Sequence, residues 1–358
     1  MNIYMLWSRY GGCGYVRQFL PMKYNNWTGD YLKLGEERDK REKAKEMIAS
    51  DIIVAHRLDD VGKINFIDKM QLDGKKLVVD NDDTTLIDEM GSLKKFMVYQ
   101  GLVHSSIKKA DLVTCSTEFL KKEYENYTDS PVVVLPNCVE PSAYPNSKHK
   151  QHKKVRIGFI GSVMYKEDRG AIQDLIVELS KREDVTVVCF GLIPPMLRKN
   201  NKDFYEGMKE DCDFWDTIDC EWTPFTPIEK YIDTINDLDI DIAVMARKDN
   251  YFNRCKSNIK YLEMAMLKIP CICQSFKDNQ SPYDNDIIDG WNGYLAEDED
   301  EFRNRIEELI RFPNVRNRIR RNAFKYVKEN YDIKNKAHLW KEAYNQIKYK
   351  HCLWEKKL

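Results

Sequence analysis

The sequence predicts an α/β protein made of two doubly wound, Rossmann-like domains that face each other across a central cleft. Three observations support this fold class. Short apolar runs alternate with longer helical patterns, which favours parallel sheets with crossover helices. The alternation stops at a polar and basic segment, residues 140–155, and then starts again. A chain of 358 residues also suggests two domains.

The first domain, expected at residues 1–148, begins with a strand and a loop that is rich in glycine. Runs such as "KLVVD" are nearly all apolar, so we expect a sheet that is covered on both faces. Helices are expected at residues 36–49 and 91–110. The expected strands are 2–7, 51–55, 76–80, 111–115 and 131–135.

The second domain, expected at residues 149–333, repeats the alternation after the linker. Ligands of doubly wound folds bind at the carboxyl ends of the strands, so we expect functional residues in the loops that follow them. The expected strands are 155–161, 185–191, 240–246 and 270–274. The expected helices include 171–181, 228–238, 257–267 and most of the chain from residue 301 onward.

Composition and charge narrow the function classes. The formal net charge is -1, so no overall field draws the chain to nucleic acid or to an anionic membrane. Ten cysteines are scattered without a Cys-x-x-Cys pair, which argues against a zinc or thioredoxin-like site. Because we find neither a signal peptide pattern nor an apolar run of about 18 residues, we expect a cytoplasmic protein without a transmembrane helix.

The stretch "FNRCKSNIKYLEMAMLKIPCIC" reads as a helix that begins at Ser257. Three cations, Arg254, Lys256 and Lys260, crowd this start, although a helix N-terminus favours acidic neighbours. A phosphate bound by the backbone N–H groups at the helix start would make these cations favourable. Lys260 and Glu263 share a helix face, which offers a cation for a diphosphate and a carboxylate for ribose hydroxyls. A sugar nucleotide matches that order of groups.

An ordinary surface ion pair between Lys260 and Glu263 explains the same residues, and short motifs often match by chance. The position of the segment favours a ligand site. It follows the expected strand at residues 240–246, where doubly wound folds bind their ligands.

Three other loops follow expected strands. Gly161 and Ser162 let the backbone approach a phosphate, although a tight strand-to-helix turn explains them equally well. Gly12 and Gly14 relax the loop after the first strand in the same way. His56 ends a third strand and is well placed for a cleft, although a lone histidine also fits a structural role.

The stretch "FNRCKSNIKYLEMAMLKIPCICQS", followed by "IIDGWNGYLAED", resembles the signature of group 1 (family 4) glycosyltransferases. The family pattern reads approximately F-N-x-x-K-S-x-I-K-x-L-E-x-A-x-x-G-x-P-V, then I-x-x-G-x-N-G-x-L. The resemblance implies a GT-B fold, in which the second domain holds most of the nucleotide. It also implies that the terminal helix, residues 334–358, crosses back to the first domain.

The resemblance implies roles for the residues that match the pattern. Glu263 would bind the ribose hydroxyls of the donor. Lys256 and Lys260 would lie near its diphosphate or sugar, beside the helix start at Ser257. The turn that closes under the donor is matched by Asn292 and Gly293.

Loops outside this signature, in both domains, acquire roles from the same resemblance. Lys166 matches the basic residue that faces the diphosphate, and His56 matches a histidine that contacts the donor sugar. The loop with Gly12 and Gly14 would face the phosphates or the acceptor, and Arg17 would add a cation there.

Two features depart from the resembled pattern. Cys255 occupies the position, eight residues before Glu263, where many members carry a second glutamate, and Lys268 stands where glycine is usual. Asp80 and Asp82 have the Asp-x-Asp spacing of metal-dependent glycosyltransferases, and clustered carboxylates suit Mg²⁺ or Mn²⁺. Because two Rossmann-like halves disfavour that class, we expect no metal, with Asp83 on the acceptor side as a candidate base.

These observations predict a metal-independent glycosyltransferase with no cofactor, which uses a nucleotide-sugar co-substrate such as a UDP- or GDP-sugar. The resemblance implies retention of anomeric configuration, and an inverting enzyme would use Asp60 or Asp83 as base. The expected acceptor is a glycan, a lipid-linked sugar or a protein, while a modified DNA base and peripheral membrane contact stay open. Two alternatives remain, a non-catalytic sugar-nucleotide-binding module and a sugar-nucleotide epimerase.

Overall fold

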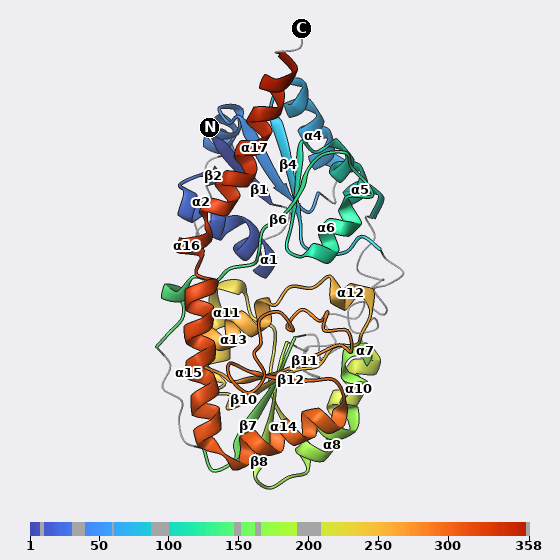
Figure 1. The fold of residues 1–358 in the computed structure, drawn as a ribbon, viewed down its shortest axis with the longest axis vertical. Helices are drawn as coiled ribbons and strands as arrows, with labels where there is room; N and C mark the ends of the chain where they lie inside the picture. The colour runs from blue at the N-terminus through green and yellow to red at the C-terminus, as the bar shows by residue number, and fades with distance from the viewer. Residues whose placement is uncertain are drawn as a thin grey trace.

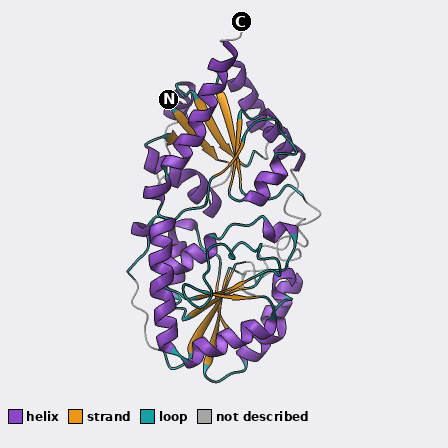
Figure 2. Cartoon of the chain, in the orientation of Figure 1, coloured by secondary structure: helices purple, strands orange, loops and turns teal. Residues whose placement is uncertain are grey.

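The computed structural model describes residues 1–7, 11–30, 40–58, 61–86, 100–146, 152–161, 166–191 and 209–355. It contains two six-stranded sheets, one in each half of the chain, which lie one above the other along the long axis (Figure 1). Helices cover both faces of each sheet (Figure 2). The prediction of two doubly wound α/β domains is therefore confirmed.

The first sheet has the strand order β2-β1-β3-β4-β5-β6, and every neighbouring pair is parallel. Its strands are β1 (Ile3–Trp7), β2 (Thr28–Gly29), β3 (Ile52–His56), β4 (Lys76–Asn81), β5 (Leu112–Cys115) and β6 (Val132–Val134). The five expected strands are present, with ends that differ by one or two residues. The additional edge strand, β2, is too short to produce a sequence pattern.

The helices of the first domain fill the connections between these strands. They are α1 (Gly12–Gly14), the π-helix η1 (Tyr15–Phe19), α2 (Leu20–Asn25), α3 (Lys40–Ile48), α4 (Val61–Leu72), α5 (Gln100–Lys109), α6 (Glu118–Tyr124) and the 3₁₀ turn η3 (Pro141–Ala143). The helices expected at 36–49 and 91–110 correspond to α3 and α5, and their expected first residues lie outside the described part of the chain.

The second sheet has the order β12-β11-β10-β7-β8-β9, again with parallel pairs only. Its strands are β7 (Val155–Ile160), β8 (Val185–Phe190), β9 (Cys220–Thr223), β10 (Ile242–Met245), β11 (Cys271–Gln274) and β12 (Tyr294–Ala296). The sequence pattern did not predict the two edge strands, β9 and β12, because they are short and β9 is only partly buried.

The helices of the second half are α7 (Lys166–Arg169), α8 (Gln173–Ser180), α10 (Lys209–Asp216), α11 (Ile228–Asp237), α12 (Tyr251–Arg254), α13 (Ile259–Met266), α14 (Glu299–Arg311), α15 (Pro313–Asn330), α16 (Ile333–Lys336) and α17 (His338–Glu355). Within the described residues, no helix combines the length and the apolarity that a membrane span requires.

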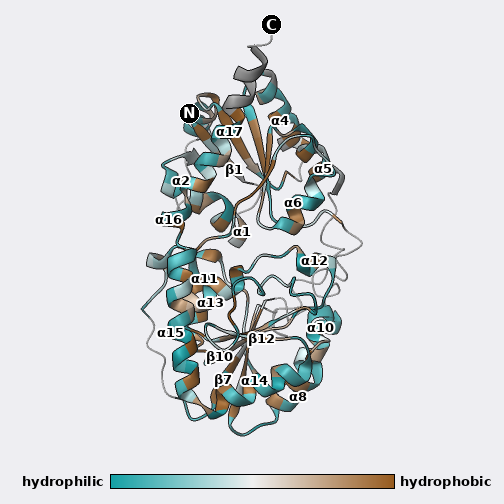
Figure 3. Ribbon diagram, in the orientation of Figure 1, coloured by the Kyte–Doolittle hydropathy of each residue, from teal (hydrophilic) through white to brown (hydrophobic). Residues whose placement is uncertain are grey.

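Both sheets are buried on their two faces, which explains the nearly continuous apolar strands. In β8, Val187 and Cys189 join one hydrophobic cluster, while Val188 and Phe190 join the cluster on the opposite face. Side chains alternate between the faces of a strand, so a strand covered on both sides needs apolar residues at every position. Apolar residues accordingly gather around the sheets and polar residues on the outer faces of the helices (Figure 3).

The last helix returns to the first domain. Trp340 and Tyr344 of α17 are buried in the same hydrophobic cluster as Ile3 and Met5 of β1, and Figure 1 shows α17 beside β1 and α2. The two segments that connect the domains also touch. Val139 exchanges backbone hydrogen bonds with the segment at 331–333, each 2.9 Å long.

Candidate active site

A cluster of three polar side chains lies at the carboxyl edge of the second sheet. Lys260 Nζ donates to the Tyr231 hydroxyl at 2.7 Å and lies 3.1 Å from Glu263 Oε2. The Tyr231 hydroxyl donates in turn to Glu263 Oε2 at 2.9 Å. One carboxylate oxygen, one ammonium group and one phenol therefore contact each other in a closed triangle, which we name the Lys-Tyr-Glu cluster.

The local sequence explains why these residues meet. In α13, Lys260 and Glu263 are three residues apart on the partly exposed side, and the apolar residues between and after them are buried. In α11, Tyr231 and Ile235 form the buried face. Burial and the neighbouring Glu263 raise the pKa of Tyr231 well above its ordinary value, so the hydroxyl keeps its proton and acts as a donor.

Gly161 brings the loop after β7 against this cluster. It has φ of 84°, and a β carbon added to it would lie 3.5 Å from Lys260 Cε. The left-handed backbone favours glycine, and the lysine occupies the space beside it. Two residues that the sequence analysis assigned to one site therefore lie side by side. Ser162, which follows Gly161, is outside the described residues.

The start of α13 differs from the prediction. The helix begins at Ile259 with Asn258 as its cap residue, whereas we expected Ser257 at its start. Asn258 Nδ2 donates to Asp286 at 2.7 Å, and the hydroxyls of Tyr326 and Tyr331 donate to the same carboxylate. A buried carboxylate thus lies near the helix start, as the helix dipole favours.

Each cation that crowds this start has an acidic partner in the structure. Arg254 pairs with Asp249 and Asp278, at 2.7 and 2.6 Å. Lys256 pairs with Asp83 of the first domain, and Lys260 with Glu263. The positive charge that seemed to require a phosphate is therefore balanced by carboxylates, of which Asp278 and Asp83 are distant in the sequence.

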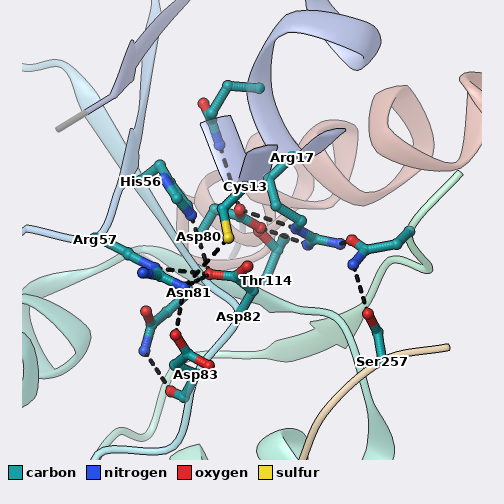
Figure 4. Close-up of polar contacts among 12 residues, drawn as sticks. Cys13, Arg17, His56, Arg57, Asp80, Asn81, Asp82, Asp83, Thr114 and Ser257 are labelled. Carbon is teal, nitrogen blue, oxygen red and sulfur yellow. Dashed lines mark hydrogen bonds and ion pairs between the residues drawn. The ribbon is translucent and has the colours of Figure 1, made fainter. Parts of the chain in front are cut away.

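Several polar contacts join the two domains beside this helix. Besides the Lys256–Asp83 ion pair, Asn137 Nδ2 donates to the Ser257 hydroxyl at 2.8 Å (Figure 4). The Thr117 hydroxyl donates to the Cys255 carbonyl at 3.1 Å. Lys256 and Ser257, both expected to bind the donor, therefore contact the first domain.

The carboxyl edge of the first sheet holds a dense network of ion pairs (Figure 4). Arg17 is 0% exposed and binds Asp80 through Nε and Nη2, at 3.1 and 2.6 Å. Its Nη1 donates to the Leu135 carbonyl and to Asn137. The guanidinium has no face open to a ligand, so we assign Arg17 a structural role in place of the expected contact with donor phosphates.

His56 and Asp83 occupy the same network. His56 is 2% exposed, with Nε2 at 3.2 Å from Asp82 Oδ1 and Nδ1 buried without a partner in the described part of the chain. Arg57 pairs with both Asp82 and Asp83. Burial would raise the pKa of Asp82, but Arg57 and the hydrogen bond from His56 hold it well below its ordinary value.

The glycines of the first loop lie next to the second domain. Gly12 and Gly14 form the short helix α1, and a β carbon on Gly12 would lie 4.0 Å from Ile228 Cδ1 of α11. Gly14 is buried. The loop therefore packs close to the helix that supplies Tyr231, on the side where we expected the donor or the acceptor.

Lys166 lies outside the Lys-Tyr-Glu cluster. It begins the short helix α7, where we expected a loop, and its exposed ammonium pairs with Glu210 at 2.5 Å. It lines a hollow of about 1050 Å³, together with Asp211, Arg247 and Gln274. Burial raises the pKa of Asp211 to about 6, with Glu167 and Glu210 adding to the effect, although Arg169 at 2.8 Å lowers it.

Comparisons of sequence identify no relative, since no family model and no curated protein match the chain. Comparisons of structure, in contrast, find similar proteins. Sucrose-phosphate synthase from Thermosynechococcus elongatus aligns with a TM-score of 0.66 and 12% identity, over 97% of this chain and 99% of that chain. HepE from Anabaena, in complex with UDP-glucose, aligns with a TM-score of 0.62 and 12% identity, over 97% and 100%.

The chain has a GT-B fold. TarM from S. aureus, as a mutant in complex with fondaparinux, alpha-GlcNAc-glycerol and UDP, also aligns, with a TM-score of 0.56 and 16% identity. That alignment covers 82% of this chain and 55% of TarM.

In this GT-B chain the turn that contains Asn292 and Gly293 is structural. Asn292 is fully buried, its side chain bonds to the backbone of Ile288 and Asp286, and its carbonyl accepts from Tyr261 of α13. A β carbon on Gly293 would lie 3.1 Å from Ile287. The turn therefore supports α13 through the hydrogen bond from Tyr261.

Both departures from the resembled pattern have local explanations. Cys255 is 1% exposed at the contact between domains, where a glutamate side chain has no room to stay hydrated. Lys268 adopts φ of 57°, in the left-handed region, which explains why the pattern usually has glycine there.

The Asp-x-Asp pair is engaged by cations. Asp80 accepts from Arg17, Gln18 and Thr114, and Asp82 pairs with Arg57. In the part of the chain that the structure describes, no group of three or more His, Cys, Asp or Glu side chains is arranged to hold a metal.

The sequence analysis did not identify Tyr231, although a hydroxyl on the apolar face of an amphipathic helix was a readable signal. Asp60, the other candidate base, is outside the described residues.

Proposed function

We propose that this protein transfers a sugar from a nucleoside diphosphate sugar to a glycan or glycoconjugate, without a metal and with retention of anomeric configuration. The Lys-Tyr-Glu cluster carries the proposal. It sets a cation and a carboxylate one helical turn apart, beside the left-handed Gly161 and at the edge where doubly wound folds bind nucleotides. The GT-B neighbours support it, because HepE was captured with UDP-glucose and TarM with UDP and a glycan.

The chemistry follows from these groups. When the bond between the anomeric carbon and the diphosphate breaks, negative charge develops on the leaving phosphate. Lys260, held in place by Tyr231, is the cation that stabilises this charge, and preorganised charges of this kind lower the barrier strongly. Glu263 accepts hydrogen bonds from the ribose hydroxyls once Lys260 turns toward the phosphate.

The setting of Asp83 supports a mechanism without a general base. Its carboxylate is paired with Arg57 and with Lys256, so both cations occupy the oxygens that a base would use. We therefore propose that Asp83 is a contact between domains that donor binding rearranges, with Lys256 released toward the diphosphate. In this scheme His56 contacts Asp82 through Nε2 and helps to hold that carboxylate in place.

The first experiment identifies the donor. A set of UDP- and GDP-sugars is tested for its effect on the melting temperature, because a ligand that binds the folded state raises it. The best donor is then followed by release of the nucleoside diphosphate. Lys260→Met should lower kcat by about 10²–10³, and Glu263→Gln should weaken donor binding. Lys230→Met, an exposed lysine beside Tyr231 in sequence, is the matched control.

Three results distinguish the alternatives. Donor binding without turnover in the wild type would identify a non-catalytic binding module. Cys255, in place of the second glutamate of the resembled pattern, motivates this alternative. Conversion of the donor to another nucleotide sugar without any acceptor would identify an epimerase. Unchanged turnover in a folded Lys260→Met variant would contradict the proposed role of the cluster.

A further inference from the structure

Helix α15 presents a positively charged face to solvent. Its 18 residues include six arginines and lysines and a single acidic residue. Four of the cations are exposed, and their spacings of three, four and three residues place them on one face of the helix. We name this face the basic stripe, and its members are Arg318, Arg321, Lys325 and Lys328.

The basic stripe is not neutralised by its neighbours. Elsewhere in the second domain, partly exposed arginines such as Arg156 and Arg305 pair closely with carboxylates, Glu221 at 2.6 Å and Asp289 at 2.8 Å. In the stripe, Lys325 lies 4.0 Å from Glu329, and the other three have no carboxylate within ion-pairing distance in the described part of the chain. This concentration stands out in a protein with a net charge of -1.

Exposed apolar side chains border the stripe. Trp291 is 39% exposed and Ile288 57% exposed, and both belong to the turn that precedes β12. The turn is fixed to α15, because Asn322 donates to the Trp291 carbonyl at 3.0 Å and Arg318 to the Gly290 carbonyl at 3.4 Å. The indole of Trp291 packs edge-on against the ring of Tyr326, with 6.4 Å between the ring centroids.

The helix also offers a second apolar group and an accessible position. Phe312, 46% exposed, immediately precedes the first turn of α15. Figure 1 shows α15 along the outer edge of the second domain, with its carboxyl end at the segment that contacts Val139.

We propose that the basic stripe, with Trp291, Ile288 and Phe312 at its borders, docks the protein on an anionic membrane surface. Basic residues are attracted to anionic headgroups, and tryptophan and aliphatic side chains insert at the boundary between headgroups and acyl chains. A lipid surface uses both kinds of residue, whereas a nucleic acid or another soluble polyanion leaves Ile288 and Phe312 without a function. This proposal is independent of the proposed transferase activity.

The test measures flotation of the full chain with vesicles. Neutral phosphatidylcholine vesicles are compared with vesicles that contain phosphatidylglycerol, at low and at high salt. Binding is expected with the anionic vesicles alone, and it should weaken as salt increases. Each basic residue near the membrane contributes about fivefold to the partition coefficient, so replacing the four cations of the stripe by glutamine should reduce binding by on the order of several hundredfold.

A matched control separates the local stripe from the total charge. Replacing four exposed lysines of the first domain by glutamine removes the same charge, and these are Lys45, Lys69, Lys108 and Lys122. This control should float like the wild type. Equal loss of binding in both quadruple variants, or no binding of the wild type to anionic vesicles, would overturn the proposal. Melting curves establish that each variant is folded.

A second arm tests the partner class. Trp291→Ala should weaken binding to anionic vesicles several-fold and leave any binding to duplex DNA or heparin unchanged. Stripe-dependent binding to DNA or heparin without binding to vesicles would replace the membrane with a soluble polyanion and overturn the proposal.

Discussion

Two buried carboxylates, one in each domain, face an arginine and nevertheless have opposite electrostatic settings. Asp82 of the first domain is surrounded by Arg57 and His56, which outweigh its burial and hold its pKa well below the ordinary value. Asp211 of the second domain has Arg169 but also Glu167 and Glu210 nearby, and its pKa is raised to about 6. An ion pair alone therefore does not fix the charge of a buried acid, because burial and all neighbouring charges act together.

The largest test of this comparison removes a cation from the first domain. Arg17→Met leaves Asp80 buried without its guanidinium, and breaking a buried pair in this way costs about 3–5 kcal/mol of unfolding free energy. Urea unfolding measures the loss. The double variant Arg17→Met/Asp80→Asn should recover part of it, because a neutral amide is less costly to bury than an unpaired carboxylate. Equal stability of the single and double variants would contradict this explanation.

The second test concerns Asp82. Its pKa is lowered in the folded protein, so the ionised carboxylate stabilises the fold at a pH above its ordinary value of 3.8, and this stability is lost as pH falls further. Asp82→Asn should be less stable than the wild type by about 1.5–3 kcal/mol at pH 7. The difference should shrink below about pH 3. A gap that stays unchanged as the pH falls well below 3 would argue against the ionised form.

The third test concerns Asp211, for which we expect stability to change with pH in the opposite direction. Its pKa is raised from 3.8 to about 6, so its stabilising contribution is complete below 3.8 and is lost as pH rises through 6. Relative to Asp211→Asn, the wild type should therefore lose on the order of 1–2 kcal/mol between pH 4 and pH 7. Unfolding of both proteins at several pH values measures this trend, and a trend in the direction of Asp82 would disprove it.

The smallest expected effect belongs to Tyr231. Tyr231→Phe removes the hydroxyl that contacts Lys260 and Glu263 and keeps the ring beside Phe190. A hydrogen bond contributes about 1 kcal/mol, so we expect a five- to tenfold loss in kcat/KM for the donor. Tyr24→Phe, which removes a hydroxyl bonded to Glu140 in the first domain, is the control. Similar losses in both variants would indicate a general effect on stability.

The sequence predicted the fold well because its signal is local. Buried parallel strands and crossover helices each leave a pattern within a few residues, and both domains were recovered from such patterns. The strands that were not predicted, β2, β9 and β12, lie at sheet edges and have two to four residues. Segments this short carry almost no periodicity, and the equally short edge strand β6 was predicted because it is a run of three valines.

The site was predictable where its residues share a helix or, like Gly161, directly follow a strand. Lys260 and Glu263 are three apart, so their spacing placed them on one face. Tyr231 is 29 residues from Lys260, and Asp83 is 173 residues from Lys256, so no local pattern connects these partners. Arg17 illustrates the same limit. Its charge was visible in the sequence, but the groups that accept its hydrogen bonds were not. The Asp80 carboxylate and the Leu135 carbonyl lie 63 and 118 residues further along the chain.

The return of α17 to the first domain constrains how the protein is made. Trp340, Ala343 and Tyr344 complete the core around Ile3 and Met5, yet the ribosome adds them after the whole second domain. Domains usually mature in the order of synthesis. Here an apolar face of the nascent first domain stays uncovered until α17 has been synthesised. The core of the domain that is translated first is therefore completed last.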